Sequence, residues 1–239
     1  MAGPTLRAAT VALLRRVPYF ARLPTAELTQ LARLCASRRL DPGQTIFEEG
    51  QPCRGLYIVA DGHVEVRQVS LRGREQVFHT EGPGATLGEA PLFDCGGYIA
   101  TAVAVEAATV VFLPRTEVID LCRRRPVVAL AMLETMARRL RRFAGIVSDL
   151  AFHPVTERLA RHLEAAAAGP VTAGAHIDVR LTQTQLAARL GTVRELVARA
   201  FAQLEANGVI TRNRTHVVVR DPARLIALAR GDGAATRDV

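Results

Sequence analysis

The spacing of apolar residues changes along the chain. Between residues 4 and 40, apolar positions recur at helical intervals, as in Leu28 and Leu31, and Thr25 stands where a helix cap is expected. From Asp41 to about residue 114 the pattern becomes short Val- and Ile-rich segments, such as GLYIVADGHVEVRQV and TAVAVEAATVVFL, separated by turns that contain glycine. Many short strands at regular spacing predict a β-roll of the cupin-like jelly-roll type.

Helical spacing returns beyond the predicted strands. A short helix is expected at about residues 115–124, followed by a long helix from Pro126 to about Ala151, with the proline in its first turn. Apolar residues of the long helix step by three and four in turn, which is the a/d pattern of a coiled coil. A helix that packs only on its own domain would show a wider stripe, so this narrow seam predicts pairing of two copies. The seam residues are Leu133, Met136, Leu140, Phe143, Val147 and Leu150.

The segment after His153 and Pro154 has the pattern of a second, smaller fold. The proline interrupts the helical spacing and predicts a hinge. After a helix at about residues 155–168, LTQTQLAARL and VRELVARAFAQLEANG predict two helices joined by a tight turn at Gly191, and VITRNRTHVVVR predicts a β-hairpin. A final short helix is expected at residues 221–230. Two helices around a tight turn, followed by a hairpin, predict a winged helix-turn-helix.

The second helix of this motif carries charge on its outward face. Arg194, Glu195 and Arg199 are expected to point outward, because apolar residues between them anchor the helix. In a DNA major groove, arginine reads O6 and N7 of guanine, and glutamate accepts from the amino group of cytosine. The alternative is a solvated face on which Glu195 pairs with Arg199. The anchoring residues are Leu186, Ala187, Leu190, Val193, Leu196, Val197 and Ala200. Thr182 is expected to cap the first helix. The residues expected to contact phosphates are Thr182, Gln183, Thr192, Arg212 and Arg214.

The overall charge agrees with a nucleic-acid partner. The chain of 239 residues has a net charge of +8, and all 31 of its basic residues are arginine. Arginine in place of lysine throughout indicates GC-rich coding, but the excess positive charge still favours binding to phosphate groups. Double-stranded DNA is therefore the expected partner. A winged helix that makes only protein contacts is the alternative, and it would more often expose an apolar patch.

Further features narrow the class of protein. The N-terminal VALL run is too short for the core of a secretory signal, and no stretch is long enough to span a bilayer. We therefore expect a cytoplasmic protein without a membrane partner. The chain has neither a P-loop, nor a nucleophile elbow, nor paired catalytic carboxylates, so an enzyme is not expected. The cysteines are too far apart for a disulfide framework or a metal site, and they are Cys35, Cys53, Cys95 and Cys122.

The order of these elements, together with the motif GTVRELVAR, resembles the CRP/FNR superfamily of bacterial transcription regulators over residues 15–230. The motif matches the G-x-x-R-E-x-x-x-R recognition helix of the cyclic-AMP receptor branch. The resemblance implies an α+β chain with a β-roll effector domain at residues 1–125, a dimerisation helix and hinge at 126–152, and a winged helix at 153–239. It further implies a homodimer that reads a palindrome with TGTGA-like half-sites and contacts RNA polymerase as an activator.

The resemblance weakens in the expected effector pocket. Cyclic-nucleotide binders of the superfamily carry an F-G-E-x-x-L motif, whose Gly-Glu takes the ribose hydroxyl, and further along an arginine for the cyclic phosphate. Here Gly88, Glu89 and Leu92 match the first part, but the following GGYIATAV holds no arginine. A buried phosphate without a countercharge is costly, so a response to cyclic AMP or cyclic GMP is not expected. The pocket residues are expected to be Gly88, Glu89, Leu92, Tyr98, Ile99 and Thr101.

Other effectors stay open at this point. Some relatives in the superfamily hold haem through His or Cys, and the candidates here are His63, His79, Cys53 and Cys95. Cys53 and Cys95 are also candidates for a redox-active thiol pair. An iron–sulfur cluster is not expected, because Cys35 is the only cysteine before residue 50. The remaining alternative is control without a small molecule, through the abundance of the protein itself.

Overall fold

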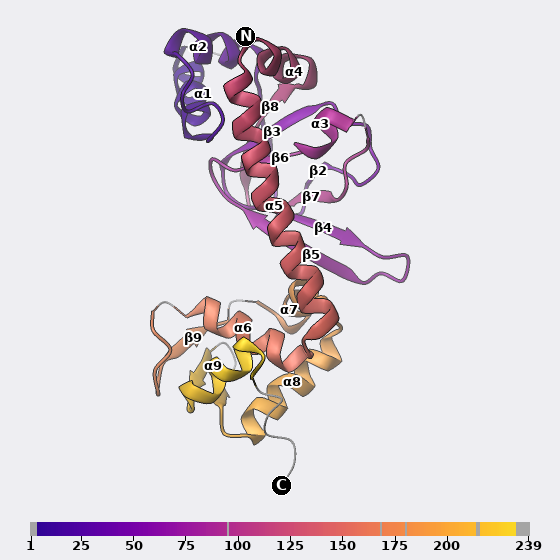
Figure 1. Cartoon of the computed structure of the whole chain (residues 1–239), viewed down its shortest axis with the longest axis vertical. Coiled ribbons are helices and arrows are strands. Elements are labelled where there is room, and N and C mark those ends of the chain that lie inside the picture. Colours follow the sequence, from indigo (N-terminus) through magenta and orange to yellow (C-terminus); the bar gives the residue numbers. More distant parts are fainter. Residues whose placement is uncertain (1–3, 95, 168, 180, 214–215, 233–239) are drawn as a thin grey trace. The chain divides into compact units, whose positions relative to one another are not determined.

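The structure is a computed structural model, and it describes residues 4–94, 96–167, 169–179, 181–213 and 216–232. The chain divides into two compact units, one formed by Met1–Gln68 with Val77–Phe143 and the other by Val69–Gln76 with Ala144–Val239. The first unit holds most of the predicted β-roll, and the second holds the predicted winged helix (Figure 1).

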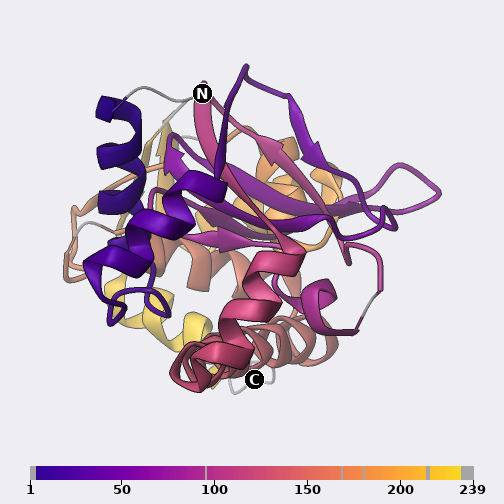
Figure 2. The same ribbon diagram turned by 90° about the horizontal axis from the view of Figure 1, so that it is seen from above.

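Two helices open the first unit and lie beside its strands (Figures 1 and 2). Helix α1 spans Pro4–Arg16 and α2 spans Thr25–Leu34. The prediction that Thr25 caps α2 is wrong, because Pro24 occupies the cap position with φ −56° and ψ 147° and no side chain caps the helix. The fixed φ of proline already suits the entry into a helix. The Thr25 hydroxyl instead accepts a hydrogen bond of 2.8 Å from Nη2 of Arg15.

The strands form two four-stranded sheets, which confirms the predicted β-roll. The first sheet has the order β1-β8-β3-β6, and its strands are Ala36–Leu40, Ala108–Pro114, Gly55–Asp61 and Thr86–Leu87. The second has the order β2-β7-β4-β5, and its strands are Thr45–Phe47, Thr101–Ala104, Val64–Val69 and Glu75–Glu81.

Strand β1 corrects the sequence interpretation, which assigned helical spacing up to residue 40. The backbone of Cys35 is extended, with φ −80° and ψ 144°, and ends α2. Ala36 then pairs opposite Phe112 in an antiparallel register with β8. Four of the five β1 residues are exposed. The strand therefore lacks the alternation of apolar and polar residues by which strands are recognised.

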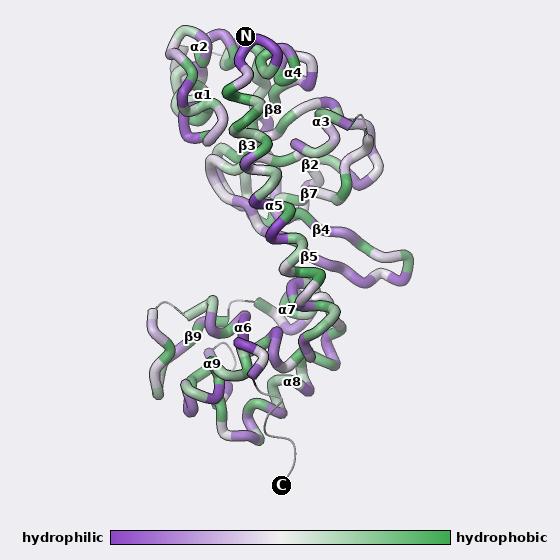
Figure 3. The backbone as a smooth tube through the Cα atoms, in the orientation of Figure 1, coloured by the Kyte–Doolittle hydropathy of each residue, from purple (hydrophilic) through white to green (hydrophobic). Residues whose placement is uncertain are grey.

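Two hydrophobic clusters stabilise the first unit, and hydrophobic stretches recur along its strands and helices (Figure 3). One cluster joins α1 and α2 to the first sheet through Leu14, Phe20 and Leu28. The other lies within the roll and includes Val64 and Leu87. Burial of each such side chain contributes about 1.5–3 kcal/mol relative to its exposed state.

Helices α3 (Ala90–Asp94) and α4 (Arg115–Arg124) precede α5, which runs unbroken over Pro126–Phe152. The predicted seam of α5 faces two directions. Leu133, Leu140 and Val147 are 60%, 71% and 64% exposed and recur every seven residues, and Leu150 is exposed as well. Met136 and Phe143 are partly buried against the β-roll of the same chain, and the Phe143 ring centroid lies 5.2 Å from that of Phe78. Pairing of two copies through α5 stays a prediction.

The second unit has the predicted winged helix-turn-helix. Helix α6 spans Val155–Ala166, the two helices of the motif are α7 (Gln183–Leu190) and α8 (Arg194–Ala206), and α9 spans Pro222–Arg230. Strands β9 (His176–Asp178), β10 (Ile210–Asn213) and β11 (His216–Val219) form a sheet of order β10-β11-β9. Its core includes Leu159, Leu163, Phe201 and Leu204. No helix within the described residues is long and apolar enough to cross a membrane.

Candidate DNA-binding face and effector cavity

The helix-turn-helix is fixed by local interactions at both ends of α7. As predicted, Thr182 caps the helix: its side chain accepts from the backbone N–H of Gln185, and the Gln185 side chain accepts from the N–H of Thr182, at 3.2 Å and 2.9 Å. Gly191 ends α7 in the left-handed conformation, with φ 64°, and its N–H donates to the carbonyl of Ala187. These contacts set the start of α8 at Arg194, three residues beyond Gly191, with Val193 as the cap residue.

Loss of the cap is expected to destabilise the second unit. Thr182→Ala removes the acceptor for the Gln185 N–H, and we expect a loss of about 1 kcal/mol in the free energy of unfolding. Thr182→Ser keeps the hydroxyl and serves as the matched control, with stability close to that of the unchanged protein. Urea denaturation followed by circular dichroism measures both. Equal stability of the alanine and serine variants would contradict the capping role.

Helix α8 presents the charged face that the sequence predicted. Arg194, Glu195 and Arg199 are all exposed, while the helix is anchored by Val197, Ala200, Phe201 and Leu204. Among the described residues, none of the ion pairs joins Glu195 to Arg199. One anchoring prediction is wrong: Leu196 is 39% exposed, because it precedes Val197 on the helix and turns about 100° away from the buried stripe.

The wing holds one of its predicted arginines in place. The guanidinium of Arg212 lies 4.7 Å from the ring centroid of Phe201 and 3.7 Å from a carboxylate oxygen of Glu205. These contacts orient Arg212 beside α8 while it stays exposed. Thr182 is also exposed, and Gln183 and Thr192 are partly exposed. Arg214 lies outside the described residues.

The β-roll contains a cavity of about 210 Å³. Of the predicted pocket residues, Gly88, Glu89, Tyr98 and Ile99 line it. The predictions for two others are wrong. Leu92 is fully buried in the core shared with α1 and α4, and the Thr101 hydroxyl faces the chain at Glu49, whose N–H donates to it at 3.1 Å.

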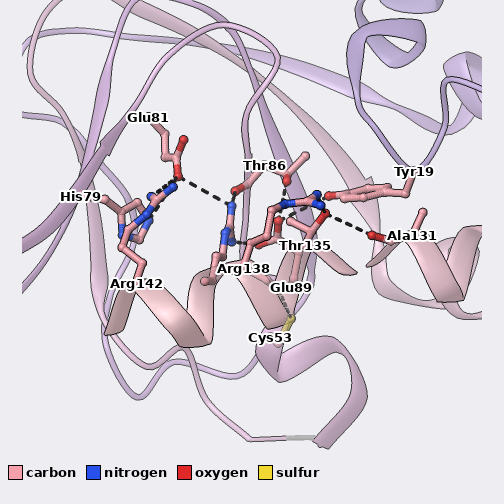
Figure 4. Close-up of polar contacts among 12 residues, drawn as sticks. Tyr19, Cys53, His79, Glu81, Thr86, Glu89, Ala131, Thr135, Arg138 and Arg142 are labelled. Carbon is pink, nitrogen blue, oxygen red and sulfur yellow. Dashed lines mark hydrogen bonds and ion pairs between the residues drawn. The ribbon is translucent and has the colours of Figure 1, made fainter. Parts of the chain in front are cut away.

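Glu89 is the centre of a buried polar network in this cavity. Its side chain is 2% exposed, and one carboxylate oxygen accepts from Nη1 of Arg139 at 2.5 Å. The other oxygen accepts hydrogen bonds from the hydroxyls of Thr86 and Tyr19. Arg139 also donates to the Thr86 carbonyl at 2.5 Å. Figure 4 shows Thr86 and Glu89 lying between Tyr19 on one side and His79 with Glu81 on the other.

Arg139 is a charged residue of the cavity wall that the sequence analysis did not place there. It belongs to the RRLRR run at residues 138–142, in the middle of the predicted long helix. Its neighbours on α5, Met136 and Phe143, lie three and four residues away and also line the cavity. Residues at these spacings share one helix face, and this spacing is the signal by which Arg139 could have been placed in the pocket.

Tyr98 occupies the part of the cavity wall where the family arginine was expected. Its ring stacks on Phe47 with centroids 3.9 Å apart and planes at 15°. Its hydroxyl donates to the Gly55 carbonyl at 3.3 Å and accepts from the Arg54 N–H at 3.3 Å. Burial raises the pKa of the Tyr98 phenol, so this side chain is neutral and supplies no countercharge for a phosphate.

His79 is held uncharged at the cavity. Burial, together with the nearby charges of Arg139 and Arg142, lowers the pKa of His79 to about 4. Its Nε2 lies 3.6 Å from a carboxylate oxygen of Glu81. Burial also raises the pKa of Glu81, and the same two arginines oppose that rise.

The shifted pKa of His79 predicts that acid destabilises the first unit. The unfolded chain takes up a proton near the ordinary pKa of 6.5, whereas the folded chain resists it down to about 4. The contribution of neutral His79 to the free energy of unfolding is therefore fully present above pH 6.5. It is lost as the pH falls from 6.5 towards 4, and the loss is about 2 kcal/mol between pH 7 and pH 5. His79→Gln should flatten this dependence in urea titrations at a series of pH values. An unaltered slope in His79→Gln would refute the assignment.

Of the other His and Cys candidates, neither His63 nor Cys53 lines the cavity. His63 lies at the surface, with Nδ1 2.5 Å from a carboxylate oxygen of Glu106. Burial raises the pKa of the Cys53 thiol, and it raises the pKa of Cys35 to about 12, whereas reactive thiols have lowered values. Cys95 lies outside the described residues. Within the described part of the chain, no group of three or more His, Cys, Asp or Glu residues is placed to hold a metal ion.

A β-roll joined by one long helix to a winged helix is the architecture of a DNA-binding transcription regulator. Residues 37–125 match the model of the cyclic nucleotide-binding domain family, and residues 157–228 match that of the Crp-like helix-turn-helix domain. The chain is 35% identical over 218 residues to the cyclic AMP receptor protein of Thermus thermophilus, which covers 90% of this chain and 97% of that protein. It is 30% identical over 221 residues to the CRP-like cAMP-activated global transcriptional regulator of Mycobacterium tuberculosis, with 91% and 99% covered.

Solved structures agree with these matches. The Thermus thermophilus catabolite activator protein aligns with a TM-score of 0.51 at 33% identity and covers 90% of this chain and 99% of that one. The c-di-GMP responsive global regulator CLP of Xanthomonas campestris aligns with a TM-score of 0.68 at 24% identity, with 79% and 95% covered, and shows likeness of fold. The chain belongs to the CRP/FNR superfamily of DNA-binding transcription regulators.

Proposed function

We propose that this protein is a homodimeric transcription regulator that reads a palindrome with TGTGA-like half-sites. The observation that carries the proposal is the exposed Arg194, Glu195 and Arg199 on a helix that begins just past a capped and glycine-terminated turn. Arginine matches the two acceptors of guanine, and glutamate matches the amino group of cytosine. Such a set gives three base contacts in each half-site.

The dimer would form along α5. Leu133, Leu140 and Val147 repeat at one heptad and leave large apolar surfaces exposed in the single chain, which pairing with a second copy would bury. The two recognition helices then enter successive major grooves, about 34 Å apart, and this distance is one turn of DNA. Activation through contacts with RNA polymerase is the role that membership of the family suggests.

The regulator is further proposed to act without cyclic AMP or cyclic GMP. Arg139 is the one arginine among the described residues that line the cavity, and it is paired with Glu89. Tyr98 stands neutral where the phosphate-binding arginine was expected. A cyclic phosphate placed here would lose its hydration without gaining a free cation. The relatives named above are a cyclic AMP receptor protein and a cAMP-activated regulator. A cyclic-AMP response measured beside theirs would therefore test whether this chain differs from them.

Fluorescence anisotropy of the nucleotide-free protein tests the proposal. One labelled duplex carries TGTGA and TCACA half-sites, and a scrambled duplex is the control, both at about 100 mM salt because phosphate contacts weaken with salt. Tight binding to the palindrome, at least about 1,000-fold tighter than to the scrambled duplex, is expected. Weak and equal binding to both duplexes would contradict it, as would a requirement for cyclic AMP in the selective binding.

A further inference from the structure

The walls of the β-roll cavity are apolar on most sides. The sheets contribute aromatic and aliphatic side chains, and α5 closes one side with three more. These residues are Phe47, Val66, Phe78, Met136, Leu140 and Phe143. A ligand that fits here exchanges contact with water for contact with hydrocarbon, so apolar surface is favoured over polar surface.

The charges at the cavity wall cancel one another. Glu89 is paired with Arg139, and His79 is uncharged at neutral pH because burial and the adjacent arginines lower its pKa to about 4. A charged ligand would therefore enter an apolar space without a free countercharge, which is costly. This balance selects an uncharged molecule.

The size of the cavity limits the ligand to one small ring system. Its volume of about 210 Å³ is smaller than the range of about 300–1,000 Å³ typical of drug-sized and cofactor sites. A dry protein cavity of roughly 150 Å³, lined by Leu, Ile and Phe, binds benzene. By proportion, this cavity holds a molecule of about eight to ten heavy atoms.

Glu89 supplies one remaining polar contact. An ionised carboxylate offers about four acceptor positions, and three of them take the bonds from Arg139, Thr86 and Tyr19. The carboxylate lines the cavity, so its fourth position can accept one hydrogen bond from a ligand. A single N–H or O–H donor on the ligand would fill it.

We propose that the β-roll cavity binds an uncharged, mainly apolar aromatic molecule of one or two fused rings that carries one hydrogen-bond donor. This inference rests on the proposed function, because such a molecule would act as the effector of the DNA-binding dimer. Its contacts with Met136, Leu140 and Phe143 would bear directly on α5, the helix proposed to pair the two copies.

Isothermal titration of the full-length protein with three matched probes tests the ligand class. Indole has the size and the single donor, indene has the same rings without the donor, and benzoate, which has as many heavy atoms as indole, carries a negative charge. Indole is expected to bind about tenfold more tightly than indene and more tightly still than the carboxylate, since an unmade hydrogen bond to a charged group costs at least this much. Cyclic AMP is titrated alongside as the charged nucleotide.

Two variants place the bound probe in this cavity. Ala100 lines the cavity and is 1% exposed, so Ala100→Leu fills the space; Ala21→Leu, at an exposed position, is its matched control. Ile99 lines the mouth and is 55% exposed, so Ile99→Trp narrows the entrance without disturbing the core and remains informative if Ala100→Leu fails to fold. We expect both cavity variants to weaken indole binding at least about tenfold, and the control to leave it unchanged.

The outcomes distinguish a failure of the ligand proposal from a failure of the proposed DNA-binding function. Failure of all three probes to bind, tighter binding of the carboxylate or of cyclic AMP than of indole, or indole binding that survives both cavity variants would overturn the inference. Selective DNA binding is measured on the ligand-free protein, so it stands or falls independently. If indole binds but DNA binding is not selective, the proposed ligand site stands. The proposed recognition of the palindrome is then rejected.

Discussion

Arg139→Leu is expected to lower the free energy of unfolding by about 3–5 kcal/mol, because removal of one partner leaves a buried charge unpaired. Glu89 is 2% exposed, and Arg139, itself 22% exposed, supplies the charge-assisted hydrogen bond to it. The hydroxyls of Thr86 and Tyr19 remain, but they carry no charge. Urea denaturation at pH 7 followed by circular dichroism measures the loss.

Two further variants isolate this ion pair. Arg141→Leu changes an exposed arginine of the same helix and should alter stability by less than about 0.5 kcal/mol. Arg139→Leu combined with Glu89→Gln removes both charges, and the double variant should recover a large part of the stability lost in the single one. If the double variant is no more stable than Arg139→Leu alone, the pair does not act as a unit and the assignment fails.

Arg194→Ala is expected to weaken binding to the palindrome by about 1–3 kcal/mol, which is roughly 5- to 150-fold. The loss should vanish when the base pair that Arg194 reads is changed in both half-sites, because the wild-type protein then loses the same contact. Anisotropy titrations against a set of duplexes with single base-pair changes provide this measurement.

Arg212→Ala is the matched control for this prediction. Arg212 lies on the wing rather than on α8, so its removal should weaken binding to every duplex by a similar factor and lower the salt dependence. If Arg194→Ala loses the same binding affinity for the palindrome and for the scrambled duplex, Arg194 contacts phosphate. The proposed role of Arg194 in base recognition would then be rejected.

The sequence predicted those parts of the fold in which local chemistry decides the structure. The cap at Thr182 and the tight turn at Gly191 depend on short-range interactions, and the outward charges of α8 follow from helical periodicity. Strand β1 escaped prediction because its partners are in β8, far along the chain, and because most of its side chains face solvent. Its conformation is set by long-range pairing that no local pattern records.

The lining of the β-roll cavity was predicted only in part for the same reason. Gly88, Glu89, Tyr98 and Ile99 come from the motif region, and they line the cavity. Arg139 enters from a helix fifty residues downstream of Glu89, so its pairing depends on how α5 packs on the roll. A motif identifies residues that are close in sequence, whereas the charge balance of a cavity depends on every element that closes it.

The position of Leu140 has a consequence for how the effector preference of such a regulator changes during evolution. This side chain lines the cavity and is also 71% exposed on the repeating face of α5. In the proposed dimer, a substitution there would alter effector preference and subunit pairing at once, so most single changes would be pleiotropic. Met136 and Phe143 lie on the cavity side and are partly buried. Inherited shifts in effector preference are therefore expected to accumulate at these two positions first, with Leu140 held back by its second role.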